Sequence, residues 1–104
     1  MIYANDKFVS MTMHRTRIQV VEDILTTTNN GNEYDGASIT QIIRQANISH
    51  GRLSRILNNL VSQGLLEQIN SKGSFRYKIS SSGQEFLSAY RTFRDFSEDF
   101  GLTI

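Results

Sequence analysis

The sequence contains no cysteine, and this absence excludes disulfide bonds, thiolate metal sites and thiol catalysis together. No apolar run approaches the roughly 18 residues that a membrane span needs. The polar residues Asn5, Asp6 and Lys7 interrupt the N-terminus, where a secretory signal would be continuous and apolar. We therefore expect a cytoplasmic protein without a membrane partner, whose stability comes from packing alone.

Residues that could form a catalytic or metal site are scarce as well. His14 and His50 are the two histidines, and the carboxylates are scattered without the spacing of a metal site or a catalytic triad. Glycine-rich loops of the kind that hold phosphates are missing. We therefore expect no enzyme activity, no metal and no cofactor, and the sequence contains no sign of a small-molecule ligand.

The chain has the length of one domain and an uneven distribution of charge. Its 104 residues, of which 38% are hydrophobic, suffice for one core but not for two. The net charge is only +1, yet the segment 36–79 carries six cations and one anion, whereas the segments 1–35 and 80–104 each sum to −2. A localised cationic region favours binding of a polyanion, and the alternative is an ordinary solvated surface.

Apolar spacing and capping residues predict two helices in the first half of the chain. Apolar residues at spacings of three and four predict a helix over residues 14–28, which ends at the asparagine-rich cluster that follows. Ser38 and Gln41 have the spacing of a capping box, in which each side chain bonds to the backbone N–H of the other residue. A short second helix over residues 39–46 is therefore predicted.

Two further helices are predicted in the second half. Ser49 is placed as the N-cap of a third helix that runs to Gln63, and Gly64 supplies the left-handed residue that commonly ends a helix. The second and third helices are thus separated by a tight turn. The serines at 80–82 can cap a long last helix that extends to about Phe100.

A β-hairpin is predicted between the third and last helices. Residues 65–69 form a short apolar run, residues 70–74 are typical of a tight turn, and residues 75–79 alternate apolar and basic side chains. The alternation directs the cations toward solvent. It directs the apolar side chains toward the helices, and these are Phe75, Tyr77 and Ile79.

This order of elements is that of a winged helix-turn-helix protein, mainly α with a three-helix core, a two-stranded wing and a long C-terminal helix. Three parts are predicted along the chain. They are an N-terminal extension over residues 1–13, a winged helix-turn-helix DNA-binding domain over 14–79 and a C-terminal dimerisation helix over 80–104.

The third helix presents side chains suited to DNA opposite its apolar side. It contains no Asp or Glu, whereas an exposed helix usually mixes both signs. Arginine donates two hydrogen bonds to guanine and asparagine pairs with adenine, while a helix N-terminus favours a phosphate. The alternative is an ordinary polar surface. The residues predicted to contact DNA are Ser49, His50, Arg52, Ser54, Arg55, Asn58 and Asn59, with Arg44, Lys72 and Arg76 on neighbouring elements.

Two of these predictions have specific alternatives. The cations of the hairpin, with Lys72 at its tip, favour contact with the phosphate backbone or the minor groove, and the alternative is an edge strand that charge protects from aggregation. His50 is expected to face solvent or a phosphate, and the alternative is a pH-sensing role.

Three sequence blocks resemble the small winged-helix transcriptional regulators widespread in archaea and, more loosely, the MarR-type and PadR-type regulators. The blocks are ISHGRL at 48–53, LVSQGLLE at 60–67 and YKISSSGQEFL at 77–87. Ser80 replaces a threonine of the family pattern and keeps its capping hydroxyl. The resemblance covers residues 14–93 and implies binding of duplex DNA as a dimer, often with repression of transcription.

The last helix carries apolar residues at alternating spacings of three and four, which is a heptad pattern typical of a coiled coil. Burying one Phe side chain contributes about 1.5 to 3 kcal/mol, so we expect a second copy to cover this side in a homodimer. The predicted dimerisation residues are Phe86, Ala89, Tyr90, Phe93, Phe96 and Phe100. In the alternative, the helix folds back on its own domain and on Ile2, Tyr3, Phe8 and Val9.

These observations predict a sequence-specific, duplex DNA-binding transcriptional regulator that acts as a homodimer and is associated with the nucleoid. Its third helix would enter the major groove and its wing would lie on the backbone. Two alternatives remain open at this point. One is a winged-helix module that binds other proteins within a larger assembly, and the other is a chromatin protein that binds DNA without sequence preference.

Overall fold

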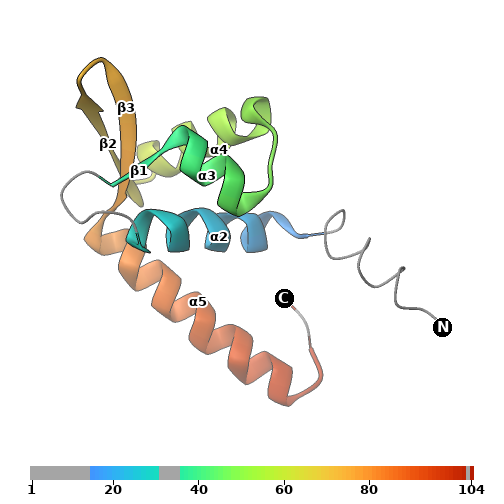
Figure 1. Ribbon diagram of the computed structural model, residues 1–104. Coiled ribbons are helices and arrows are strands. Elements are labelled where there is room, and N and C mark those ends of the chain that lie inside the picture. Colours follow the sequence, from blue (N-terminus) through green and yellow to red (C-terminus); the bar gives the residue numbers. More distant parts are fainter. Residues whose placement is uncertain (1–14, 31–35, 103) are drawn as a thin grey trace.

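The computed structural model describes residues 15–30, 36–102 and 104, and the predicted N-terminal extension over residues 1–13 lies outside them. Figure 1 shows the order of elements. The helices are α2 (Arg17–Asn30), α3 (Ile39–Ala46), α4 (His50–Ser62) and α5 (Ser81–Asp99), and the strands are β1 (Ala37–Ser38), β2 (Leu66–Ser71) and β3 (Ser74–Ile79). The mainly helical winged-helix fold predicted from the sequence is confirmed.

The first described helix differs from its prediction at both ends, since α2 runs from Arg17 to Asn30 instead of over 14–28. Its N-terminus is a capping box that the apolar spacing did not reveal. The hydroxyl of Thr16 accepts from the N–H of Gln19 at 3.2 Å, and the side-chain oxygen of Gln19 accepts from the N–H of Thr16 at 3.0 Å. These bonds satisfy two N–H groups that otherwise lack partners at a helix start.

The predicted bounds of the second helix are confirmed, because α3 covers Ile39–Ala46. The capping box is present in full, with Ser38 accepting from the N–H of Gln41 at 3.2 Å and donating its own N–H to the Gln41 side chain at 2.9 Å. At the other end Asn47 is left-handed, with φ of 53°. Capping chemistry thus sets both ends of a helix that is too short for its apolar spacing alone to define.

The sheet has three antiparallel strands in the order β1-β3-β2, one strand more than the predicted hairpin. Ala37 of β1 pairs with Tyr77, and on the other side of β3 Leu66 pairs with Ile79. A strand of two residues is too short to show an alternating pattern, so β1 could not be predicted from the sequence.

The turn of the hairpin is shorter than the predicted segment 70–74. Ser71 pairs with Ser74, so only Lys72 and Gly73 form the turn. Both have positive φ, 52° and 82°, as a two-residue type I′ turn requires. Glycine adopts this conformation at no cost, and Lys72 is held in it by the strands on either side.

The core lies where α2, α3 and α4 meet the inner face of the sheet. Its most completely covered side chains are Ile24, Leu25, Ile42, Leu53 and Leu57. Each comes from the apolar side of one of the three helices, as their spacing predicts. The core thus fixes which face of α4 points outward.

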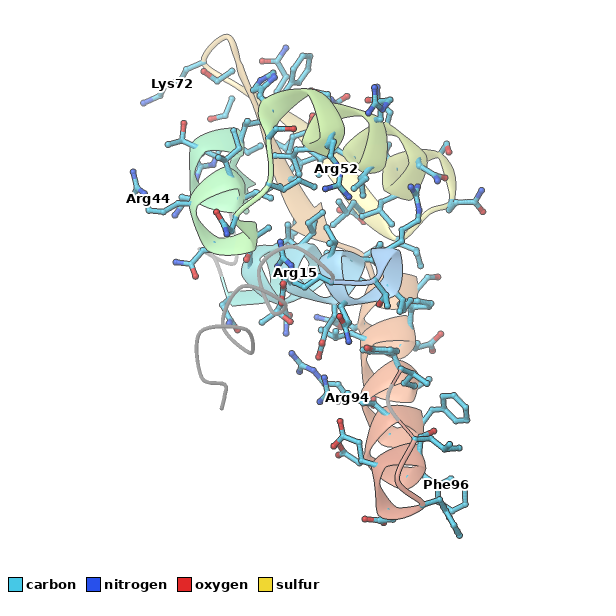
Figure 2. The ribbon with its side chains drawn as sticks, turned by 90° about the vertical axis from the view of Figure 1, so that its right-hand side faces the viewer. Arg15, Arg44, Arg52, Lys72, Arg94 and Phe96 are labelled. Atoms are coloured by element: carbon cyan, nitrogen blue, oxygen red, sulfur yellow. The ribbon has the colours of Figure 1, made fainter. Side chains whose placement is uncertain are left out.

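The helix α5 extends away from this core. In both views α2 lies between the α3–α4 pair and α5 (Figures 1 and 2). The first turn of α5 rests on the base of the hairpin, where a Cβ on Gly83 would lie 2.2 Å from the carbonyl oxygen of Leu65. Among the helices that the structure describes, none is long and apolar enough to cross a membrane.

Candidate nucleic-acid interface

The tight turn between α3 and α4 places α4 on the outside of the molecule. The N–H of Asn47 donates to the carbonyl of Ile43 at 2.9 Å, which ends α3. Ile48 is buried and anchors the turn in the core. Ser49 then begins α4, and its hydroxyl accepts from the N–H of Arg52 at 3.4 Å. The predicted role of Ser49 as N-cap is confirmed.

The helix α4 has one buried face and one exposed face. Its buried residues are Leu53, Ile56, Leu57 and Leu60. The predicted DNA-contacting residues on the exposed face are His50, Arg52, Arg55, Asn58 and Asn59, while Ser54 is half-buried at the edge. The fold thus brings the predicted base-contacting side chains together on one accessible surface.

The charges on this face are not neutralised within the described part of the chain. There the ion pairs join residues of α2 and α5 and Arg15 just before α2, and none reaches Arg52 or Arg55. The first turn of α4 contains no acidic residue, so the partial positive charge at the helix N-terminus also remains. Arg44, in the last turn of α3, projects into solvent (Figure 2). The surface therefore has a positive potential that an anion could neutralise.

The wing carries a cation at its tip and an exposed aromatic ring beside it. Figure 2 shows Lys72 at the end of the hairpin, away from the helices. The prediction that Phe75 packs on the helices is wrong, because its side chain is 49% exposed while Tyr77 and Ile79 on the same side of β3 are buried. Phe75 lies one pair from the turn, beyond the edge of the core, and none of the described helices buries it.

Arg76 occupies a different environment from the other predicted contacts. Its guanidinium donates to the carbonyl of Gly36 at 3.0 Å and to the side-chain oxygen of Gln41 at 3.4 Å. Arg76 thus links β3 to the start of α3, and its contact with a phosphate stays a prediction. The sequence could not show this link, because Gly36 and Arg76 come together only when β1 pairs with β3.

The functional groups of the described residues favour anion binding over metal chemistry. They contain no group of three or more His, Cys, Asp or Glu side chains that could hold a metal ion. The exposed face of α4 instead presents guanidinium and amide groups, which donate several hydrogen bonds in a fixed geometry. Such groups match oxygen and nitrogen acceptors on phosphates and base edges.

A second accessible surface lies at the far end of α5. Phe93, Phe96 and Phe100 are 57%, 59% and 68% exposed, and we call these three residues the α5 aromatic stripe. The rings of Phe96 and Phe100 meet edge to face with centroids 5.0 Å apart. Large apolar side chains grouped in this way are unusual on a monomer and typical of an interaction surface.

Two of the predicted dimerisation residues are not part of this exposed stripe. Tyr90 is only 8% exposed, and its hydroxyl donates to the carbonyl of Ile104 at 3.3 Å, so its own chain covers it. Phe86 is half-buried and packs partly against the domain core. Ala89 is exposed on the side of α5 that leads to the aromatic stripe. The apolar residues spaced three and four apart in α5 thus pack against their own chain in the first half of the helix. In the second half they are exposed to solvent.

The two surfaces lie at opposite ends of the molecule. Figure 2 shows Lys72 at the end formed by the wing and Phe96 at the end formed by α5. A contact between α2 and α5 that the sequence did not predict joins these ends. Glu22 of α2 pairs with Arg91 and Arg94 of α5. No local spacing signals a contact between residues so far apart in the chain.

The helix pair, the three-stranded sheet and the long last helix define a winged helix-turn-helix protein. Residues 14–98 match the model of the family described as winged helix-turn-helix. Since the match covers most of the chain, the chain belongs to the winged helix-turn-helix family. No curated protein matched the chain.

Solved structures give an independent comparison. The crystal structure of Sso10a-2, a DNA-binding protein from Sulfolobus solfataricus, is similar to the chain with a TM-score of 0.72. The similarity covers 83% of this chain and 85% of that chain, with 22% sequence identity. At this identity the likeness establishes the fold alone.

Proposed function

We propose that the chain is a transcriptional regulator of the nucleoid that binds duplex DNA sequence-specifically as a homodimer. The observation that carries the proposal is the exposed face of α4. It holds Arg52, Arg55, Asn58 and Asn59 without an acidic residue or an ion-pair partner in the described part of the chain, at the position where the family has its recognition helix. The DNA-binding description of the similar Sulfolobus protein supports the proposal.

The contacts divide by the chemistry of the side chains. Arg52, Arg55, Asn58 and Asn59 approach base edges in the major groove, which admits an α-helix. Ser49 and His50 at the helix N-terminus, together with Arg44, meet phosphates. At the wing, Lys72 contacts the phosphate backbone of the DNA, and the exposed ring of Phe75 packs against the neighbouring sugars.

Self-association through α5 completes the proposal. The α5 aromatic stripe lies opposite the DNA-contacting end, so a partner bound there leaves α4 free. Twofold pairing places two copies of α4 in one assembly, and each then contacts one half of a palindromic site.

Selection of bound sequences from random duplex DNA tests the proposal. Enrichment of a palindrome is the expected result, because a twofold dimer contacts two related half-sites. Binding without enrichment would indicate a chromatin protein that is indifferent to sequence. No binding at low salt would contradict DNA binding and favour a module that contacts other proteins.

Lys72→Ala is expected to weaken binding by a similar factor on every duplex and to lower the slope of log K against log salt by about one unit, because one phosphate contact is lost. Fluorescence anisotropy titrations at several salt concentrations measure both quantities. Phe75→Ala serves as the matched wing control, since it removes contact area without charge and should leave the slope unchanged. An unchanged slope for Lys72→Ala would place the wing away from DNA.

Replacing both Phe96 and Phe100 by serine is expected to convert the dimer into a monomer, because each exposed ring contributes about 1.5 to 3 kcal/mol when it is buried. Sedimentation equilibrium should give about twice the chain mass of 11.8 kDa for the unaltered protein and that single mass for the variant. The control Thr92→Ser alters an exposed α5 residue and should remain dimeric. A mass of 11.8 kDa for the unaltered protein at micromolar concentration would refute the dimer.

A further inference from the structure

One carboxylate joins the winged-helix core to α5. The Oε2 atom of Glu22 accepts from Nη1 of Arg94 at 2.7 Å and from Nε of Arg91 at 3.2 Å. The same Arg91 donates through Nη2 to the hydroxyl of Thr26 at 2.6 Å. The side chain of Glu22 is only 14% exposed, so solvent screens these ion pairs less than surface pairs. We call Glu22, Arg91 and Arg94 the α2–α5 clamp.

The clamp resists rotation as well as separation. Glu22 and Thr26 lie one turn apart on α2, and Arg91 and Arg94 lie about one turn apart on α5, so the bonds engage two points on each helix. The hydrogen bond with Glu22 raises the pKa of Arg94 above its ordinary value. Arg94 also lies over the ring of Tyr90, at 5.6 Å from its centroid.

The clamp lies between the two surfaces of the proposed function. On α2, Glu22 belongs to a helix that contributes to the core that orients α4. On α5, the two arginines flank Phe93, and the helix continues past Arg94 to Phe96 and Phe100 of the α5 aromatic stripe (Figure 2). A tilt of about 10° at this joint moves a point about 20 Å away by about 3.5 Å, close to the rise of roughly 3.4 Å per base pair. A small change in the angle between α5 and α2 thus moves α4 by about one base pair along the DNA.

We propose that Glu22 is a positioning residue that, through Arg91 and Arg94, fixes the angle between α5 and the DNA-contacting unit. In the dimer this angle sets the separation of the two α4 helices and therefore the spacing between half-sites. The inference rests on the proposed homodimeric DNA binding. It adds that half-site spacing is determined by an ion-pair cluster within one protomer, outside the DNA-contacting face of α4.

Glu22→Gln removes the charge and keeps the shape, and Arg94→Gln breaks the clamp from α5. Asp23→Asn is the matched control, because Asp23 is the next residue of α2 and pairs instead with Arg15, whose guanidinium also bonds to the carbonyl of Ala46. Each α2 variant removes one negative charge. Only Glu22→Gln loosens α5.

The first readout needs no DNA. Because the chain has no cysteine, Ser62→Cys at the exposed end of α4 carries one spin label per protomer. We expect a narrow distribution of label-to-label distances in the parent dimer and in Asp23→Asn, and a broad one in Glu22→Gln and Arg94→Gln. Narrow distributions in both clamp variants would overturn the inference. If no label-to-label distance between two protomers is detected in the parent, the dimer itself is contradicted.

The second readout uses duplexes that carry two selected half-sites with varied spacers. For the parent and Asp23→Asn, a wrong spacing should weaken binding by about tenfold, comparable to one mismatched base pair. Glu22→Gln should reduce this preference to about twofold while binding an isolated half-site as tightly as the parent, since its base-contacting residues are unchanged. A spacing preference that survives in Glu22→Gln would overturn the inference, and weaker binding to the isolated half-site would show a merely structural role.

Discussion

Gly83→Ala is expected to lower the free energy of unfolding by about 3 kcal/mol, the upper end of the range for an overpacked site. A Cβ at this position would lie 2.2 Å from the carbonyl oxygen of Leu65 and 2.7 Å from Cγ1 of Ile79. The first of these atoms belongs to the backbone, so no change of side-chain rotamer can relieve the clash. The first turn of α5 must therefore move away from the base of the hairpin, which also weakens the burial of Leu87.

Gly51→Ala is the control for this prediction. Gly51 lies in the first turn of α4, and apart from its chain neighbours and the backbone of its own helix, no atom lies within 4 Å of the Cβ that alanine would add. Alanine in a helix is favoured over glycine by about 0.5 to 1 kcal/mol, so this variant should be slightly more stable than the parent. Urea unfolding of the three proteins measures both effects. Equal stability of Gly83→Ala and the parent would mean that α5 does not rest on the hairpin.

Arg55→Ala is expected to weaken binding to the selected site by about 1 to 3 kcal/mol and to relax the base preference at one position. The guanidinium lies on the exposed face of α4, and within the described residues no ion pair competes for it. Arginine donates two parallel hydrogen bonds to the O6 and N7 atoms of guanine, so its loss affects one base more than the others.

Arg55→Lys separates the two ways in which this residue could act. Lysine keeps the charge but lacks the planar pair of donors. If Arg55 contacts a base, the lysine variant loses specificity almost as fully as the alanine variant. Competition titrations with the selected duplex and with single-base variants measure this. Restoration of both affinity and specificity by lysine would assign Arg55 to a phosphate.

The parts of the fold that local chemistry determines could be predicted from the sequence. The start of α3 followed from Ser38 and Gln41, because capping residues act on the backbone beside them. The buried face of α4 followed from its apolar spacing, which also defined its exposed face. The predicted DNA-contacting residues of α4 therefore lie together, although their contacts with DNA remain predictions.

Features that depend on distant residues could not be predicted. The strand β1 exists because Ala37 meets Tyr77, and its two residues show no pattern of their own. Phe75 continues the alternation of β3 but extends past the edge of the core, so alternation alone placed it wrongly.

The same limit applies to α5. Its spacing of three and four suggested one continuous contact surface, whereas Tyr90 is covered by Ile104 and only the later phenylalanines are exposed. The α2–α5 clamp depends on Glu22 meeting two arginines far along the chain. Periodicity identifies an apolar side of a helix, but the tertiary structure decides which part of that side remains free.

Titration of the isotopically labelled protein with its selected duplex, followed by amide chemical shifts, tests the central claim most directly. We predict that the largest changes occur from Ser49 to Ser62 and at Lys72, with small changes on the far end of α5 from Phe93 to Phe100. Changes confined to α5, with α4 unaffected at saturating duplex, would contradict the assignment of α4 as the DNA-contacting surface.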